Sequence, residues 1–124
     1  MNDIELAWAA GFFDGEGTTH LGKSTKGDRF TKPKLTIPQK ELECLARFRK
    51  ALGNRGTIYG PIKQKRDSEI YHYSIQKAKE VDETLTLLWP FLSDVKKNQA
   101  TKAGFQLGII RSPRIGRPRG KKIT

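Results

Sequence analysis

The sequence predicts an α+β fold with elements in the order helix, strand, strand, helix, strand, strand, helix, and with an antiparallel sheet made of two hairpins. Two observations support this class. Apolar residues repeat first with the period of a helix and then with the period of two that is typical of strands, and this change occurs twice along the chain. Short polar turns separate the strands of each pair, as expected for β-hairpins. The 124 residues suffice for one domain with a modest core.

The first helix is predicted over residues 4–14, with Asn2 or Asp3 capping its N-terminus. Its residues are almost all apolar, so we expect the helix to be buried on all sides. Two glycines flank Glu16, and glycine tolerates the backbone angles that end a helix. The carboxylate of Glu16 is therefore expected at the tip of a buried helix.

A helical wheel separates large residues from small ones on this helix. The large arc is expected to pack in the core of the subunit and comprises Ile4, Trp8 and Phe12. The small arc comprises Ala7, Ala10, Gly11 and Asp14. Because alanine and glycine let a second backbone approach closely, the small arc is a candidate contact with another helix.

The first hairpin is predicted to run from residue 18 to residue 37, with its turn at residues 26–29. The positions expected to point into the core are Leu21, Leu35 and Ile37. Pro38 is expected to end the second strand, because proline has no N–H to donate to a sheet. The alternate positions are polar or basic, so the hairpin should present a basic outer face.

The second helix is predicted over residues 41–52, with Gly53 as its stop. Its apolar positions are Leu42, Leu45, Phe48 and Leu52. The second hairpin follows, with strands over residues 57–63 and 70–76. In the first of these strands, Ile58 and Ile62 are expected on one face, and Thr57, Tyr59 and Lys63 on the other. In the second strand, Tyr71, Tyr73 and Ile75 should point inward.

Two further helices are predicted over residues 79–88 and 96–110, and Pro90 interrupts the chain between them. The apolar stripe of the last helix comprises Ala100, Ala103, Leu107 and Ile110. Residues 111–124 contain six basic residues and no acidic one, with no periodicity, so this tail is expected to be disordered until it meets a partner. The expected organisation is a domain over residues 1–110 followed by the tail.

The charge balance restricts the class of partner. The chain has 24 Lys and Arg against 13 Asp and Glu, a formal net charge of +11. A polyanion would offset this charge, and nucleic acid is favoured over a membrane because no long apolar run is present. The N-terminus lacks the basic start of a secretory signal, and the single Cys44 allows neither an internal disulfide nor a zinc cluster. A reducing compartment, cytoplasmic or organellar, is therefore expected.

Residues 9–17, Ala-Ala-Gly-Phe-Phe-Asp-Gly-Glu-Gly, resemble the motif of the LAGLIDADG homing endonucleases. Residues 35–40, Leu-Thr-Ile-Pro-Gln-Lys, resemble the end of the strand that precedes the second helix in that family. Residues 89–92 and 95–100 resemble a later segment of the family, so the resemblance covers roughly residues 6–108. It implies a helix-strand-strand-helix-strand-strand-helix core whose saddle-shaped antiparallel sheet lies along DNA.

The resemblance also implies an assembly and a set of site residues. Members with one motif are homodimers, and one motif is present here, so the small arc would be the dimer contact. By similarity Glu16 is the metal-binding acid, with the carbonyl of Gly15 as a further ligand. Gln39 resembles the residue that positions water, and Lys96, or alternatively Lys97, resembles the basic residue of the water pocket. The implied cofactor is Mg²⁺, which carboxylates can hold against a phosphodiester.

Strand parity predicts which side chains would face the major groove of DNA or its flanking phosphates. On the strands these are His20, Ser24, Lys26, Lys32, Lys34, Thr36, Tyr59, Lys63, His72 and Ser74. Lys65 and Arg66 in the second turn, and Arg114, Arg117 and Arg119 in the tail, extend the set. Residues 116–119, Gly-Arg-Pro-Arg, resemble the core of an AT-hook, and a basic tail that contacts phosphates non-specifically is the alternative.

Three functional hypotheses follow. The preferred one is a homodimeric, Mg²⁺-dependent endonuclease that cuts both strands of a long, roughly palindromic DNA target. The second is a protein on the same scaffold that binds without cleaving, either an intron maturase, which would bind RNA, or a DNA-binding regulator. The third is a basic ribosome-associated protein, against which the apolar helix ending in Gly-Glu-Gly argues.

Overall fold

The computed structural model describes residues 2–23, 31–65 and 68–110, although the side chains of residues 22, 23, 31 and 32 fall outside the description. The elements follow in the order α1 (Asp3–Glu16), β1 (Thr18–Lys23), β2 (Thr31–Gln39), α2 (Leu42–Ala51), β3 (Thr57–Lys63), β4 (Glu69–Ile75), α3 (Ala78–Leu88), the 3₁₀ helix η2 (Trp89–Phe91) and α4 (Asp94–Lys102). The predicted α+β class and the predicted order of elements are confirmed.

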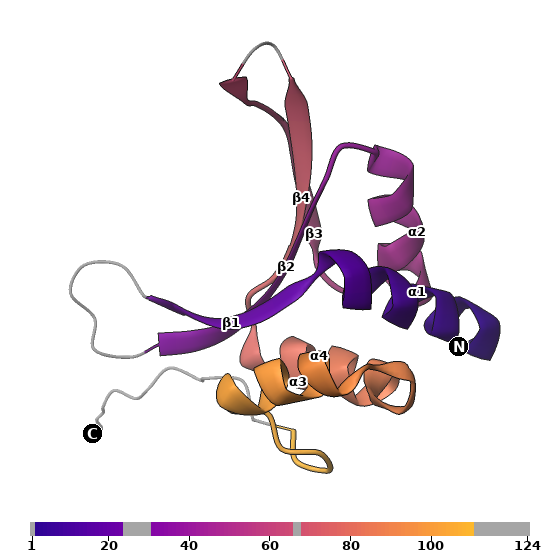
Figure 1. The fold of residues 1–124 in the computed structure, drawn as a ribbon, viewed down its shortest axis with the longest axis vertical. Helices are drawn as coiled ribbons and strands as arrows, with labels where there is room; N and C mark the ends of the chain where they lie inside the picture. Colours follow the sequence, from indigo (N-terminus) through magenta and orange to yellow (C-terminus); the bar gives the residue numbers. More distant parts are fainter. Residues whose placement is uncertain (1, 24–30, 66–67, 111–124) are drawn as a thin grey trace, which may run out of the picture.

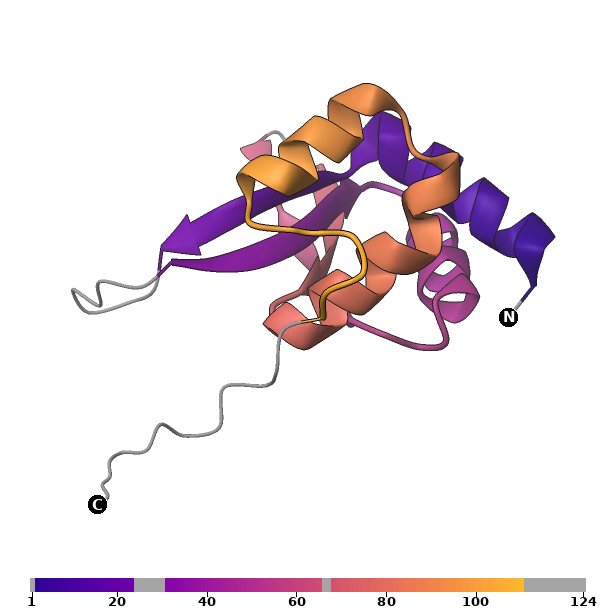
Figure 2. The same cartoon turned by 90° about the horizontal axis from the view of Figure 1, so that it is seen from below.

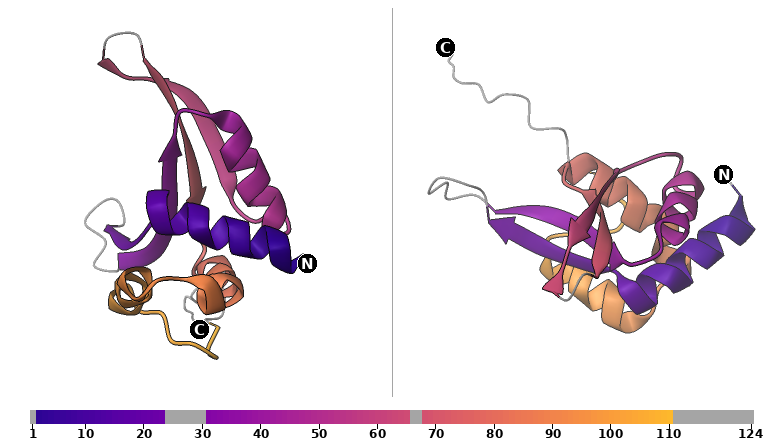
Figure 3. Two further views of the ribbon diagram at one scale, coloured as in Figure 1. Left: turned by 45° about the vertical axis from the view of Figure 1, so that its right-hand side comes forward. Right: turned by 90° about the horizontal axis from the view of Figure 1, so that it is seen from above.

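The sheet is antiparallel and has four strands in the order β1-β2-β4-β3. The two hairpins diverge from the centre of the sheet, β1–β2 in one direction and β3–β4 in another (Figure 1). The helices gather on one side, with α2 beside the β3–β4 hairpin and with α3 and α4 below α1 (Figure 1 and Figure 3, left). In the view from below, α3 and α4 lie nearest the viewer (Figure 2). The opposite face of the sheet, which we call the concave face, is covered by no helix of the described residues.

The core lies between the helices and the centre of the sheet. Its largest fully buried side chains include Phe13 of α1, Phe48 of α2 and Tyr73 of β4. Phe48 packs edge-on against Tyr73, with ring centroids 5.0 Å apart, which is a favourable aromatic geometry. The hydroxyl of Tyr73 donates to the carbonyl of Arg55 at 2.5 Å, so the one polar atom of this ring is satisfied.

The strand β2 contains two prolines at positions where it has a single neighbour. Pro33 pairs with Leu21 of β1, at a point that β4 does not reach, since β4 pairs with β2 only from Leu35 onward. Pro38 pairs with His72 of β4, beyond the end of β1. The prediction that Pro38 ends the strand is therefore wrong, because a proline is tolerated where a strand has no neighbour on one side.

A bulge in β3 changes which side chains share a face. Tyr59 lies opposite His72 and Ile62 lies opposite Ile70, so the register shifts between them. Opposite residues in an antiparallel pair share a face, which places Ile62 on the concave face with Tyr59. Lys63, opposite Glu69, is moved to the other face. The sequence pattern had predicted the reverse, with Lys63 on the same face as Tyr59 and with Ile62 on the other face.

The helix α4 is shorter than predicted and ends at Lys102. Gly104 has a φ of +100°, and its N–H donates to the carbonyl of Thr101 while the N–H of Phe105 donates to that of Ala100. These two bonds form a Schellman cap, which ends the helix. Phe105 returns to the core, whereas Leu107 and Ile110 are exposed. No helix in the described part of the chain is long and apolar enough to cross a membrane.

Candidate functional site

The C-terminal end of α1 presents Glu16. Gly17 leaves the helix in an extended conformation, and its N–H closes the last turn on the carbonyl of Phe13 at 2.8 Å. A Cβ on Gly17 would lie 2.1 Å from the ring of Phe13, so only glycine fits at this position. The helix therefore stops where the chain must pass close over Phe13, and the exposed carboxylate of Glu16 stands at that end.

The start of α4 is joined to this end of α1 by Asp14. Ser93, the N-cap of α4, donates through its backbone N–H to the two carboxylate oxygens of Asp14 at 3.2 and 3.1 Å, and through its hydroxyl at 3.1 Å. The same hydroxyl accepts from the N–H of Lys96 at 3.3 Å. Asp14 thus orders the junction between the two helices, and its carboxylate benefits from the positive end of the α4 dipole.

Lys96 is held at the end of α1 where Glu16 is the last helical residue. Its Nζ donates to the carbonyl of Gly17 at 2.5 Å and lies 5.9 Å from the ring centroid of Phe13. The last turn of α1 contains no basic residue, so Lys96 supplies the cation that the negative end of this helix dipole favours. Lys97 instead places its Nζ 5.5 Å from the ring centroid of Trp89. Of the two lysines that the sequence left open, Lys96 is the one at the Glu16 end.

Gln99, one turn further along α4, holds the start of β1. The N–H of Thr19 donates to Oε1 of Gln99 at 2.9 Å. The carbonyl of Gly15 lies in the last turn of α1, where a helix provides no donor for its carbonyls, and it stands beside Glu16 in the chain. Sequence reasoning did not single out Gln99 as a residue that shapes the site.

Gln39 is the sequence-predicted catalytic residue that the structure does not bring into contact with the others. It is the last residue of β2, and its Oε1 accepts from the N–H of Lys40 at 3.0 Å. Among the residues that are described, no hydrogen bond joins Gln39 to Glu16 or Lys96.

The donors at the end of α1 are oxygen atoms of the kind that Mg²⁺ prefers. The carboxylate of Glu16 has no hydrogen bond or ion pair within the described residues, and the Gly15 carbonyl is free of a helical donor. The same part of the chain contains no cluster of three acidic, histidine or cysteine side chains able to hold a metal. One chain therefore offers a fitting but incomplete set of ligands.

The outer face of α1, formed by Ile4, Ala7, Gly11 and Gly15, is exposed. A Cβ on either glycine would meet no atom within 4 Å in this chain, so the subunit itself does not require a glycine there. Ala10 was predicted to lie in the small arc with Ala7 and Gly11, but its side chain is fully buried in the core.

Another residue of α1 also lies elsewhere than predicted. Ile4 was predicted to hold the core, but it is 77% exposed. The helix instead turns Leu6, Ala9, Ala10 and Phe13 inward, while Trp8 and Phe12 pack at the margin of the core. The expectation that α1 is buried on all sides does not hold for a single chain.

The concave face contains a groove of about 350 Å³. Six residues predicted to face DNA line it: His20, Lys34, Thr36, Tyr59, His72 and Ser74. Ser74 is only 9% exposed and lies low in the groove. The remaining lining residues are Ile62, Tyr73 and Gln76. Ile62 was predicted on the other face because the sequence pattern did not indicate the bulge. The Gly60-Pro61 pair inside a predicted strand was the available signal.

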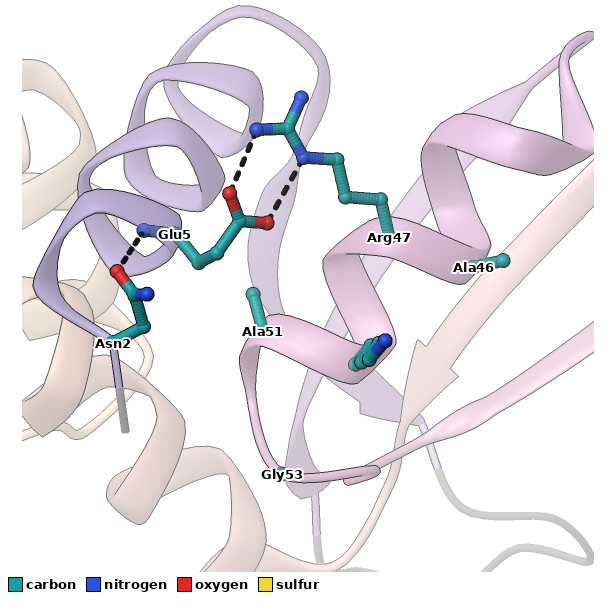
Figure 4. A pocket seen from close by; sticks show the side chains of 7 residues that line it. Asn2, Glu5, Ala46, Arg47, Ala51 and Gly53 are labelled. Atoms are coloured by element: carbon teal, nitrogen blue, oxygen red, sulfur yellow. Dashed lines mark hydrogen bonds and ion pairs between the residues drawn. The ribbon is translucent and has the colours of Figure 1, made fainter.

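A second hollow, of about 620 Å³, lies between the start of α1 and α2 (Figure 4). Two hydrogen bonds from Arg47 to Glu5, at 3.0 and 2.8 Å, span it, and they lower the pKa of Glu5 below its ordinary value. The guanidinium of Arg47 also lies over the ring of Trp8, 4.0 Å from its centroid. These contacts join α1 to α2 at the opposite end of α1 from Glu16.

Apart from Lys63, one of the remaining predicted DNA contacts is described, and the side chains of the others lie outside the described residues. Lys65 is described and is exposed in the turn between β3 and β4. The side chain of Lys32 lies outside the described part of the chain, as do the following residues: Ser24, Lys26, Arg66, Arg114, Arg117 and Arg119.

The αββαββα order with a four-stranded antiparallel sheet matches the fold of solved LAGLIDADG homing endonuclease structures. No protein-family model matches the sequence, and no curated protein matches it significantly. The likeness lies in the fold.

Three solved structures illustrate the likeness. The homing endonuclease I-CvuI, in complex with the I-CreI target in the presence of Mg, superposes with a TM-score of 0.65 at 21% identity, over 82% of this chain and 64% of that one. The LAGLIDADG meganuclease I-CpaMI bound to uncleaved DNA gives 0.61 at 22% identity, over 82% and 35%. The archaeal intron-encoded homing endonuclease I-Vdi141I complexed with DNA gives 0.57 at 22% identity, over 72% and 56%. This chain thus spans less than two thirds of the length of each of these proteins.

Proposed function

We propose that this protein is a site-specific, Mg²⁺-dependent homing endonuclease that acts as a homodimer on a long, roughly palindromic DNA target. The observation that best supports the proposal is the contact of Lys96 with the carbonyl of Gly17, which brings an ammonium group to the end of α1 that carries Glu16. Metal-dependent phosphodiester hydrolysis uses a carboxylate to hold the metal ion and can use a nearby cation to stabilise charge on the phosphate.

The homodimer is supported by the outer face of α1. Its glycines, Gly11 and Gly15, have open space around them in one chain, and small residues on a helix permit close packing of a second helix. A two-fold contact along this face would bring two copies of Glu16 together, since the same surface meets itself across the axis. Each subunit would then contribute its incomplete set of Mg²⁺ ligands to the region around the two-fold axis.

Each site residue has a distinct role in this proposal. Glu16 and the Gly15 carbonyl would hold Mg²⁺, which when bound stabilises charge on a phosphate and makes water a better nucleophile. Lys96 would add positive charge at its Nζ, kept in place by the Gly17 carbonyl. Gln39 would orient the attacking water from the end of β2, once its side chain leaves the N–H of Lys40.

DNA would lie along the concave face. The groove there is lined by Lys34 and two histidines and, within the residues described, by no carboxylate. This surface matches the polyanion in charge, as does the net charge of +11. We assign residues 111–124 to additional phosphate contacts, with Arg114, Arg117 and Arg119 as cations in and beside the AT-hook-like segment of residues 116–119.

The proposal is tested by cleavage with a matched pair of variants. Wild-type protein should cut its target duplex when Mg²⁺ is present and should bind without cutting when EDTA is present. Glu16→Gln should retain binding and lose cleavage, whereas Glu43→Gln, at an exposed acid on α2, should cut as the wild type does. Equal cleavage by Glu16→Gln and the wild type would refute the assignment of Glu16.

The second candidate function is nucleic-acid binding without cleavage, as an intron maturase or a DNA-binding regulator. The observation that favours it is that one chain supplies a single free carboxylate at the end of α1, while the concave face needs no metal to bind. Gel shifts with intron RNA and with target DNA, each with and without Mg²⁺, separate the two functions. Tight metal-independent binding of RNA with no cleavage of DNA would favour the maturase.

A further inference from the structure

The bulge in β3 places an apolar side chain on the surface assigned to DNA. Gly60 has a φ of +123°, a conformation that glycine adopts without strain, and a Cβ there would lie 2.9 Å from the carbonyl of Ile70. The pairing with β4 shifts at this point, so Ile62 joins Tyr59 on the concave face.

Ile62 remains accessible to water although it lines a groove. It is 42% exposed, and the neighbouring Tyr59 is 46% exposed. The other lining groups near them, His20, Lys34 and His72, are polar or basic. An exposed aliphatic side chain in a basic groove gains free energy when an apolar group of an anionic ligand covers it.

The major groove of DNA offers one such group, the C5 methyl of thymine. We propose that Ile62, with the ring of Tyr59 beside it, contacts a thymine methyl and thereby requires thymine at a defined position in each half of the target. This inference rests on the proposed function, since it specifies one element of the sequence that the concave face recognises.

Replacement of thymine by deoxyuracil tests the inference, because the two bases differ only by this methyl. Duplexes bound by the wild-type protein are selected from a random pool, and each thymine of the selected sequence is replaced singly by deoxyuracil. Dissociation constants are then measured by fluorescence anisotropy. For the wild type we expect binding to weaken about fourfold at one position in each half-site, the value for one buried methyl group.

Two variants assign the effect to its residue. In Ile62→Ala the thymine and deoxyuracil duplexes should bind equally well at that position. Leu21→Ala removes an equally exposed aliphatic side chain, 46% exposed, from the opposite face of the sheet, and it should discriminate as the wild type does. Both residues are exposed, so neither variant is expected to disturb folding.

Two results would overturn the inference and leave the proposed function intact. The first is a duplex that is bound and cut but in which no replacement of thymine by deoxyuracil weakens binding. The second is an Ile62→Ala variant that still prefers thymine over deoxyuracil as strongly as the wild type does. Failure to bind any duplex would overturn the inference together with the proposed function.

Discussion

Substitution of Gly11 by leucine should have opposite effects on the folding of one chain and on its dimerisation. Within one subunit the Cβ of residue 11 meets nothing within 4 Å, so replacing a glycine in the middle of α1 should stabilise the helix by about 1 kcal/mol. Within a dimer packed along the outer face of α1, the added side chain must fit between two backbones. Overpacking of this kind costs about 1–3 kcal/mol per site.

A two-fold contact contains the substitution twice. The expected penalty on dimerisation is therefore roughly 2–6 kcal/mol, which weakens association by at least about thirtyfold. Sedimentation velocity across a concentration series measures this change, and urea unfolding at low protein concentration measures the gain in the single chain. The dependence of unfolding on protein concentration should decrease in parallel, since dimerisation stabilises the folded state by mass action.

The matched control is Ala46→Leu, at an exposed position on α2. It adds a leucine to a helix surface away from the outer face of α1, and it should sediment as the wild type does. If Gly11→Leu also sediments as the wild type does at every concentration, the assignment of this face to a dimer contact is refuted.

Three further predictions concern the core and the site. Tyr73→Phe removes the hydrogen bond to the Arg55 carbonyl and should cost about 1–2 kcal/mol in urea unfolding. Burial raises the pKa of Tyr73 above its ordinary value of 10.0. Above pH 10 the tyrosine ionises in the unfolded chain but not in the folded one, so the wild type should lose stability as the pH rises. The Tyr73→Phe variant has no such group and should lose less. Thr84→Val should raise the melting temperature, because Oγ1 of Thr84 is buried without a partner among the described residues. Lys96→Met should slow DNA cleavage far more than Lys97→Met, and equal rates for the two would contradict the role given to Lys96.

The sequence predicts most elements of the fold because their periodicity is clear. The strand Thr57–Lys63 has the predicted bounds, since polar turns flank it on both sides. The end of α4 was missed because Ala103 and Leu107 keep a helical spacing after the helix has stopped. Gly104, with its positive φ, decides the stop, and a regular apolar pattern does not reveal such a cap.

The faces of α1 were less predictable than its existence. A wheel separates Ala7 and Gly11 from the large residues, but Ala10 fits equally well against the subunit's own core, where it is buried. The location of Ile4 depends on where the core ends, which no local pattern specifies. The choice between Lys96 and Lys97 likewise needed the helix start at Ser93, which fixes the direction of each side chain.

The two prolines of β2 have a consequence for how the sheet avoids mispairing. Pro33 marks the end of the strand that β4 does not reach, and Pro38 the end that β1 does not reach. If β4 extended over Pro33, or β1 over Pro38, the new pairing would meet a residue that has no N–H to donate. Extension of either ladder is thus penalised at a fixed residue, and the prolines limit the stretch of β2 on which both hairpins are joined. Because the hairpins are joined only along this stretch, the two prolines also limit where the hairpins begin to diverge. They thereby influence the width of the concave face.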